Sequence, residues 1–197
     1  MATAVLAVTG RCGTIVPDSR IRSRTNMLSK LNQKLHQELG IPADFGDGRN
    51  LPYYEETTDL IEVGPNLVGT MQRLTPEAAA QWQQMVEAAA GSGIRLLIVS
   101  GYRSHDYKAE LIRTKITAGQ HIDEILAVSA APGYSQHHTG TAVDIAAPGS
   151  RPLTEEFETS DAFQWLTEHA ADYGFSMTYP RDNPYGFIFE PWHWALG

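Results

Sequence analysis

The chain has 197 residues, of which 42% are hydrophobic and 19% are charged, and its formal net charge is −8. This length suits one domain with a sizeable core. An acidic chain whose lysines and arginines are scattered is not expected to bind nucleic acid, because phosphate contacts need clustered basic residues. The single cysteine, Cys12, excludes an internal disulfide and a cysteine-rich zinc cluster.

The N-terminal stretch "MATAVLAVTGRCG" is apolar only briefly and lacks a basic region before it, so it does not match a secretory signal. No stretch of the sequence approaches the roughly 20 apolar residues of a membrane span. We therefore predict no membrane span. The compartment stays open: cytoplasmic for the chain as given, or periplasmic or cell-wall-associated if a leader has been removed. Residues 1–24 are predicted to be an N-terminal extension, and residues 25–197 a single domain.

The segment "TNMLSKLNQKLHQELG" predicts the first helix. Thr25 is placed to cap its start and Gly40 to end it. Leucines recur through the segment at helical spacing, at Leu28, Leu31, Leu35 and Leu39. Residues 41–66 are rich in proline, glycine and acidic residues, which predicts a long loop that ends in a short strand. This loop is also a candidate lid for a site.

The next helix has a clearer start, because Thr75 is placed as its cap and Pro76 as its first residue. Its apolar stripe predicts that it runs to Gly91. The segment "IRLLIVSGYRS" predicts a central strand that leads into a turn. Ser104 then caps a further helix, which we expect to end near Gly119.

The segment "TAVDIAA" predicts another strand, and "SDAFQWLTEHAADYG" predicts a helix from Ser160 to Gly174. The last segment, from "FSMTYP" to "GFIFEPWHWAL", predicts two or three short strands. Helices come mainly first and antiparallel strands last, which indicates an α+β fold with a small antiparallel sheet flanked by helices.

Two histidines and an aspartate form a candidate metal site. His137 and Asp144 flank a glycine-containing turn, and His193 lies near the C-terminus. Two imidazoles and one carboxylate leave the fourth position of a zinc ion open for water, as in catalytic zinc sites. Glu190 would point away from His193 in an extended chain, so we predict a bend at Pro191. The bend would place the Glu190 carboxylate beside the metal, where it can accept a proton from water.

Each of these residues also has an ordinary structural interpretation. His137 on its own is more often a loop histidine, and Asp144 a turn or strand-edge acid. Glu190 and His193 could form a surface pair near a frayed end. The neighbouring His138 is not expected to be a ligand, because adjacent side chains point in different directions.

Two motifs match the signature of a known family. The first, S-x-H-x-x-G-x-A-x-D, is matched at Ser135, His137, Gly140, Ala142 and Asp144, and the second, E-x-W-H, at Glu190, Trp192 and His193. The chain resembles the zinc D-alanyl-D-alanine metallopeptidases of the vancomycin-resistance type, the VanY carboxypeptidases and their VanX dipeptidase relatives, which share a fold with the hedgehog signalling domain. The resemblance runs from about Leu74 to the C-terminus and includes "IVSGYRS" with its arginine.

The resemblance implies a zinc cofactor bound by His137, Asp144 and His193, with Glu190 as the catalytic base. It also implies that Arg103 faces the reaction centre, where a guanidinium would stabilise the oxyanion of a tetrahedral intermediate. The structural alternative for Arg103 is a salt bridge at the end of a strand.

The sequence departs from the family at one position that matters for substrate. Many carboxypeptidases of this type have a glutamine five residues after the arginine, which helps to hold the terminal carboxylate, and this chain has Lys108 there. A lysine could bind that carboxylate as a point charge or could point to solvent. Ser135 is a candidate for binding substrate backbone or for shaping the turn. Tyr134 and Trp192 are candidates for the pocket wall, or for the core.

The predicted function is therefore a zinc carboxypeptidase that removes the C-terminal D-alanine from a peptidoglycan stem peptide. Close alternatives are an L,D-carboxypeptidase, a D,D-dipeptidase and an endolysin-type endopeptidase. An alternative from another class is a zinc-containing binding module without hydrolysis. A peptidoglycan-derived peptide is the expected partner, and the oligomeric state is left open.

Overall fold

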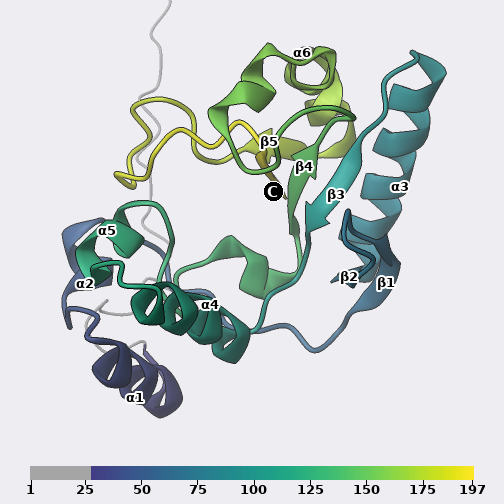
Figure 1. The fold of residues 1–197 in the computed structure, drawn as a ribbon. Coiled ribbons are helices and arrows are strands. Elements are labelled where there is room, and N and C mark those ends of the chain that lie inside the picture. The colour runs from purple at the N-terminus through teal and green to yellow at the C-terminus, as the bar shows by residue number, and fades with distance from the viewer. Residues whose placement is uncertain (1–27) are drawn as a thin grey trace, which may run out of the picture.

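The computed structural model describes residues 28–197 (Figure 1). The predicted extension, residues 1–24, and the predicted cap Thr25 lie outside this part of the chain. Helices alternate with short antiparallel strands, so the predicted α+β class is confirmed. None of the helices within 28–197 combines the length and the apolar character that crossing a bilayer requires.

A four-stranded antiparallel sheet, in the order β3-β4-β6-β5, forms the centre of the fold. Its strands are β3 (Leu97–Ser100), β4 (Ala142–Ala146), β5 (Phe175–Met177) and β6 (His193–Leu196). The prediction that "IRLLIVS" is a central strand is wrong, because β3 lies at an edge and β4 and β6 occupy the centre. An apolar run indicates that both faces of a strand are buried, but it does not indicate whether the strand has a neighbour on one side or on both.

A hairpin and a long helix cover one side of the sheet. They are β1 (Ile61–Pro65), β2 (Met71–Leu74) and α3 (Pro76–Gly91). The Thr75 hydroxyl accepts a hydrogen bond from the N–H of Ala78, and Pro76 is the first helical residue, so the predicted start of α3 is confirmed. The apolar stripe predicts burial of Trp82, Met85, Val86 and Ala89; Val86 is half-buried and the other three are buried.

The other helices lie in two places (Figure 1). The first group is α1 (Lys30–Leu39), α2 (Phe45–Gly48), α4 (His105–Thr117) and α5 (Ile122–Ala127). The remaining helix, α6 (Asp161–His169), packs on the sheet. Short 3₁₀ helices cover Gln136–Thr139, Glu155–Thr159 and Ala170–Tyr173.

Two predicted helix boundaries differ from the structure. Helix α1 begins later than predicted, because the Ser29 hydroxyl accepts from the N–H of Asn32 and caps the helix there. The segment that ends at Gly174 leaves the α-helix after His169 and finishes as a 3₁₀ turn. The predicted cap of α4 is confirmed, because the Ser104 hydroxyl accepts from a main-chain N–H of the first turn.

The apolar side chains form two separate cores. The first core lies between the sheet, α3 and α6, and it includes Met85, Val143, Ile145, Leu166, Phe175 and Trp194. The second core joins α1, α2, α4 and α5 and includes Leu35, Phe45, Ile112, Ile125 and Phe187. Hydrophobic burial in two cores leaves the polar residues of the motifs at the junction between them.

Candidate metal centre and its cavity

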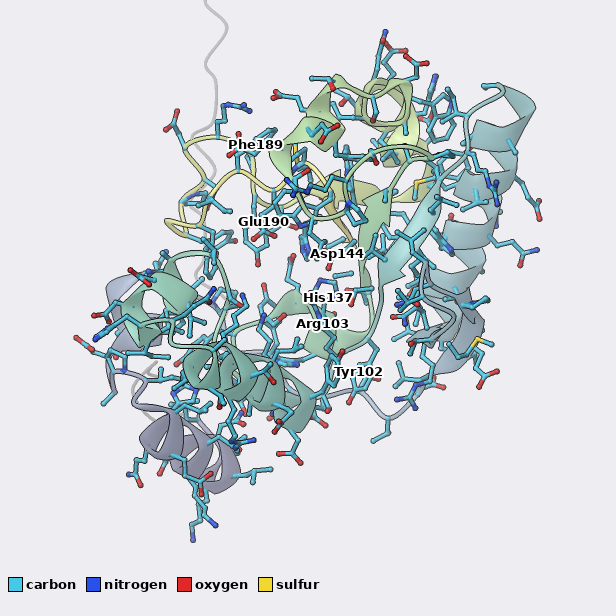
Figure 2. The ribbon with its side chains drawn as sticks, in the orientation of Figure 1. Tyr102, Arg103, His137, Asp144, Phe189 and Glu190 are labelled. Carbon is cyan, nitrogen blue, oxygen red and sulfur yellow. The ribbon has the colours of Figure 1, made fainter. Side chains whose placement is uncertain are left out.

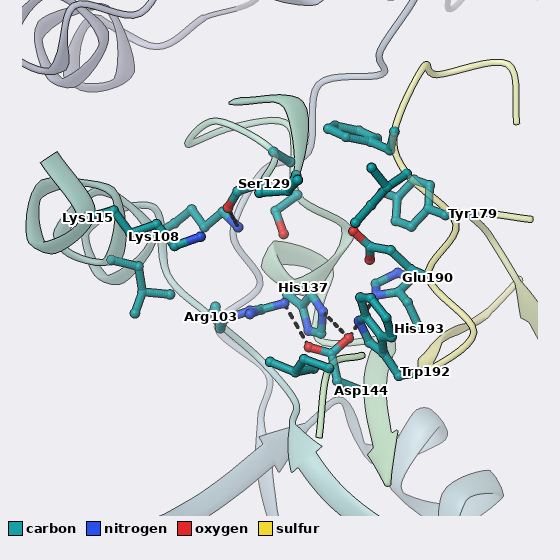
Figure 3. A pocket seen from close by; sticks show the side chains of 17 residues that line it. Arg103, Lys108, Lys115, Ser129, His137, Asp144, Tyr179, Glu190, Trp192 and His193 are labelled. Carbon is teal, nitrogen blue, oxygen red and sulfur yellow. Dashed lines mark hydrogen bonds and ion pairs between the residues drawn. The ribbon is translucent and has the colours of Figure 1, made fainter. Parts of the chain in front are cut away.

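Two histidines and one aspartate converge where the 3₁₀ turn Gln136–Thr139 meets β4 and β6 (Figures 2 and 3). Oδ1 of Asp144 lies 3.2 Å from Nε2 of His137 and 3.1 Å from Nδ1 of His193. The ligand atoms of the three residues all lie within 4.8 Å of one another, and the three side chains are buried. The structure therefore brings together the three residues predicted to bind a metal.

The main chain sets these three positions. Asp144 and His193 are direct cross-strand partners in the β4–β6 pairing. The turn that carries His137 is held by a hydrogen bond of 3.1 Å from the N–H of Arg103 to the carbonyl of His137. Gly140 ends this turn with φ of 69°, a left-handed conformation that glycine adopts without steric cost.

Each imidazole has a hydrogen-bond acceptor on the nitrogen that faces away from Asp144. Nδ1 of His137 lies 2.7 Å from the carbonyl oxygen of Gly101. Nε2 of His193 lies 2.9 Å from Oε1 of Gln136. A carbonyl oxygen can only accept, so these nitrogens are the ones that carry the ring proton, and the opposite nitrogens are left as ligands.

The donor set fits a zinc ion. Ligands at about 2.1 Å from a tetrahedral zinc are roughly 3.4 Å apart, close to the Asp144–imidazole distances above. Burial lowers the pKa of His137 to about 3. Burial opposes ionisation of Asp144, but the Arg103 guanidinium beside it helps to hold the pKa of its carboxyl well below the usual range. Neutral imidazole and ionised carboxylate are the forms that bind divalent metals.

Glu190 lines the same cavity but is not one of the three converging ligand residues (Figure 3). The N–H of His193 donates to the carbonyl of Glu190 at 3.1 Å, so the chain turns at Pro191 and the predicted bend is confirmed. Burial raises the pKa of the Glu190 carboxyl.

Arg103 reaches the centre from the loop between β3 and α4. Its Nη2 donates to Oδ2 of Asp144 at 3.1 Å, so the ion pair considered for it is present. Its Nε is buried and has no hydrogen-bond partner within residues 28–197. The guanidinium therefore keeps an unused donor next to the ligands.

Lys108 lies on the α4 side of the cavity and is only 5% exposed, so it does not point to solvent. Its Nζ donates to Oγ of Ser129 at 2.9 Å. In the described part of the chain no carboxylate lies within ion-pair distance of this ammonium. Burial, assisted by repulsion from Arg103, lowers the pKa of Lys108 to about 7.

The cavity between these groups has a volume of about 360 Å³. Apolar side chains line much of it, among them Leu111, Val128, Ala130, Leu153, Phe187 and Ile188. No residue of the segment 41–66 lines it. The N–H of Tyr54 instead pairs with the carbonyl of Gly133, and the N–H of Thr57 with that of His138. The expectation that the 41–66 loop could form a lid is therefore not supported.

The other predicted pocket residues have different positions. Ser135 is buried and lines the cavity. Trp192 lines it too, and it also belongs to the first core. Tyr134 does not line it: its ring packs against Phe45 and Tyr53, 5.7 and 6.2 Å between centroids.

His138 hydrogen-bonds the main chain on both sides of its ring. Its Nε2 accepts from the N–H of Gly133 at 3.1 Å, so its Nδ1 carries the proton and donates to the carbonyl of Arg103 at 2.6 Å. As predicted, it is not among the converging ligands.

Three cavity-side residues were not predicted. Ser129 holds Lys108, Tyr179 places its ring 4.8 Å from that of His193, and Gln136 accepts from the same histidine. Ser129 and Tyr179 lie outside both motifs, and Gln136 occupies a variable position within the first. The sequence therefore contains no signal that distinguishes them from other polar residues.

A family model and the curated proteins similar to this chain all name carboxypeptidases. The family model described as "VanY: D-alanyl-D-alanine carboxypeptidase" matches residues 71–196. YodJ of Bacillus subtilis (strain 168), a carboxypeptidase by name, is 34% identical over 120 residues, which are 59% of this chain and 44% of that protein. A D-alanyl-D-alanine carboxypeptidase of Enterococcus faecalis (strain ATCC 700802 / V583) is 30% identical over 133 residues, 62% of this chain and 48% of that protein. The chain therefore spans less than half the length of these curated relatives.

The chain is also similar to solved structures of peptidases. The LD-carboxypeptidase LdcB is 29% identical with a TM-score of 0.64, over 74% of this chain and 71% of that one. The D,D-pentapeptidase VanY of the VanB-type resistance cassette is 27% identical over 73% of this chain and 79% of that one. It was solved as a mutant with Zn(II), TM-score 0.54, and with D-alanine-D-alanine, TM-score 0.56.

Proposed function

This chain belongs to the VanY family of D-alanyl-D-alanine carboxypeptidases, and on that premise we propose that it is a zinc carboxypeptidase that removes the C-terminal D-alanine of peptidoglycan stem peptides. One observation carries the proposal. A single cavity contains the three converging ligand residues, the buried carboxyl of Glu190 and the buried ammonium of Lys108.

His137, Asp144 and His193 would hold the zinc ion. Zinc in a three-ligand site supplies Lewis acidity, which polarises a carbonyl and brings the pKa of water to about 7. The VanY structure with Zn(II) supports this choice of metal. The buried ion pair between Asp144 and Arg103 keeps the carboxylate ionised in the absence of bulk water.

Glu190 has the place of a general base. Its carboxylate accepts a proton from the attacking water and passes that proton to the nitrogen of the leaving D-alanine, so the peptide C–N bond breaks as a C–O bond forms. Glu190 precedes His193 by three residues, and the turn at Pro191 places the Glu190 side chain in the cavity beside the three converging ligand residues.

Arg103 lines the cavity and has the charge to stabilise the oxyanion that forms on the scissile carbonyl. One arm of its guanidinium is held by Asp144, while Nε has no partner in the described residues. The held arm fixes the side chain, so no reorganisation is needed as the charge develops.

Lys108 and Ser129 would bind the terminal carboxylate of the substrate. A buried ammonium without a counter-ion is costly, and an incoming carboxylate would remove that cost. This favours a carboxypeptidase over an endopeptidase, because an internal peptide bond brings no carboxylate to that end of the cavity. The solved relatives include an LD-carboxypeptidase and a protein in complex with D-alanine-D-alanine.

The test is a release assay with matched substrates. The purified protein is incubated with a stem pentapeptide that ends in D-Ala-D-Ala, with the tetrapeptide and with free D-Ala-D-Ala, each with and without chelator, and D-alanine is measured by mass spectrometry. We expect release from the pentapeptide that stops with chelator and returns with zinc.

Other outcomes identify the alternatives. Release from the tetrapeptide alone indicates an L,D-carboxypeptidase, and cleavage of the free dipeptide alone indicates a D,D-dipeptidase. Internal cleavage indicates an endopeptidase. Zinc binding without any cleavage would indicate a non-catalytic module and would overturn the proposal.

A further inference from the structure

The side chain of Gln136 links the two halves of the metal centre. It lies in the 3₁₀ turn beside His137, and its Oε1 is 2.9 Å from Nε2 of His193, which is 57 positions further along the chain. Gln136 occupies a position that the S-x-H-x-x-G-x-A-x-D motif leaves variable. The reaction derived above gives it no role.

The geometry of His193 explains why this contact matters. Nδ1 of His193 faces Asp144 at 3.1 Å and is the nitrogen available to a metal. A neutral imidazole has one proton, so Nδ1 is free to bind a cation only when Nε2 carries that proton. His193 is buried, and a buried N–H needs an acceptor. Within residues 28–197, Oε1 of Gln136 is the acceptor that Nε2 has.

The Gln136 side chain has a second partner. The hydroxyl of Tyr54 makes a side-chain hydrogen bond with Gln136. With Oε1 accepting from His193, the amide nitrogen is left to donate to the Tyr54 oxygen. A flipped amide would place its NH₂ against the ring N–H of His193.

The second imidazole is held differently. His137 uses the main-chain carbonyl of Gly101 as its acceptor, at 2.7 Å, which no side-chain substitution removes. The acceptor of His193 is a side chain and can be replaced. The two ligands therefore differ in how far a single substitution can affect their orientation.

We propose that Gln136 is a positioning residue for the metal, which accepts the Nε2–H of His193 and thereby directs Nδ1 toward the ion. The inference rests on the zinc site of the proposed function, but not on hydrolysis. Partners of this kind fix both the tautomer and the ring orientation of a histidine ligand, and their loss typically weakens metal binding about 10- to 100-fold.

The test compares two variants of nearly equal length. Gln136→Met removes the acceptor, and Gln136→Glu retains one. Gln164→Met is the control, because the Gln164 side chain is exposed on α6, where its amide donates to Glu168. The zinc dissociation constant of each is measured by competition with a chromophoric chelator. We expect Gln136→Met to bind zinc about 10- to 100-fold more weakly, while Gln136→Glu and the control stay near wild type.

A second measurement uses the wild-type protein. In its zinc-loaded form the ring Nε2–H of His193 should give an NMR signal that exchanges slowly with water, and this exchange should be faster in Gln136→Met. If that variant does not fold, the wild-type signal still decides the question. A wild-type His193 that lacks a protected Nε2–H, or a Gln136→Met variant with unchanged zinc affinity, overturns the inference.

The failures can be told apart. Gln136-dependent zinc affinity without D-alanine release leaves this inference standing and removes the proposed reaction. Normal D-alanine release, together with a zinc affinity that does not depend on Gln136, supports the proposed reaction and overturns this inference. A wild-type protein that binds no zinc overturns both.

Discussion

The wall of the cavity that carries the metal ligands depends on main-chain pairing between β4 and β6, whereas the opposite wall consists of side chains from α4 and the loop 128–130. On the first wall, Asp144 and His193 are cross-strand partners and their positions follow from register. On the second, Lys108 is held by one hydrogen bond to Ser129. A one-residue slip would destroy the first wall, while single substitutions can change the second.

This difference separates the chemistry from the choice of substrate. Asp144 and His193, two of the residues expected to hold the metal, lie on paired strands of the sheet, and the other residues expected to act in hydrolysis lie on turns and loops next to it. Of the residues expected to recognise the terminal carboxylate, Lys108 lies on α4, which packs against the second core, and Ser129 lies in the loop 128–130. Substitutions on the two walls should therefore change different kinetic parameters.

The largest effect is expected from His193→Ala, which removes a ligand from the rigid wall. Two remaining protein ligands are fewer than catalytic zinc sites use, so zinc and D-alanine release should both be lost. Metal content after gel filtration and the release assay measure this. His121→Ala, at an exposed histidine before α5, is the matched control and should change neither. Zinc retained at wild-type affinity in His193→Ala would show that the centre lies elsewhere.

Glu190→Ala should separate binding from catalysis on the same wall. Because Glu190 is not among the three converging residues, zinc content should stay at one per chain, while kcat falls by roughly 10²- to 10⁴-fold, the range typical of a lost general base. Glu87→Gln, at an exposed position on α3, serves as the control. Full activity in Glu190→Ala would mean that another group takes the proton.

Lys108→Met tests the opposite wall. Loss of a charge-assisted hydrogen bond costs about 1.5–3 kcal/mol, which corresponds to a rise in KM of about 10- to 100-fold for peptides with a free C-terminal carboxylate. Peptides with an amidated C-terminus should show no change, and kcat should remain near wild type. Lys34→Met, at an exposed lysine of α1, is the control. An equal effect on acid and amide substrates would remove Lys108 from carboxylate binding.

The smallest effect is expected from pH. Burial lowers the pKa of Lys108 to about 7, with Arg103 and Lys115 adding repulsion and Glu190 and Asp144 opposing it. The ammonium is lost as pH rises through about 7, so kcat/KM for free-acid peptides should fall severalfold more above that pH than kcat/KM for amidated peptides. Lys108→Arg keeps its charge and should remove this difference. If kcat/KM for free-acid peptides depended on pH in the same way in wild type and in Lys108→Arg, titration of Lys108 would not be the cause.

The free energy of unfolding should rise with pH over the range in which kcat/KM for free-acid peptides falls. Between pH 7 and about 10.5, the unfolded chain binds a proton at Lys108 that the folded chain does not, so the free energy of unfolding rises with pH across that window. Below pH 7 the folded protein carries the full cost of the buried charge. At pH 6, Lys108→Met should therefore be more stable than wild type in urea titrations.

Local signals predicted much of the fold. Thr75, Ser104 and Ser160 cap α3, α4 and α6, because N-cap bonds reach only three residues along the chain. The edge position of β3 was not predictable, since strand order depends on pairing between distant segments. The start of α1 was also missed: Thr25 and Ser29 both suit a cap, and the choice depends on packing.

For the site, motif spacing predicted the three converging ligand residues and the bend at Pro191. It did not predict Ser129, Tyr179 or the role of Gln136. These residues act through contacts across 21 to 57 positions or through ring packing, and no sequence pattern records such contacts. Tyr134 was a candidate for the pocket wall or for the core, and the structure packs it against the second core.

The sequence by itself determined which residue types are available for the chemistry and where the helices and strands begin, because hydrogen bonding, capping and periodicity act over a few residues. Only the tertiary structure decided which nitrogen of each histidine faces Asp144, that the buried Lys108 has no carboxylate partner among the described residues, and that no residue of 41–66 lines the cavity. Those features depend on strand register and on packing between segments far apart in the chain, and side-chain orientation is fixed only when these segments meet.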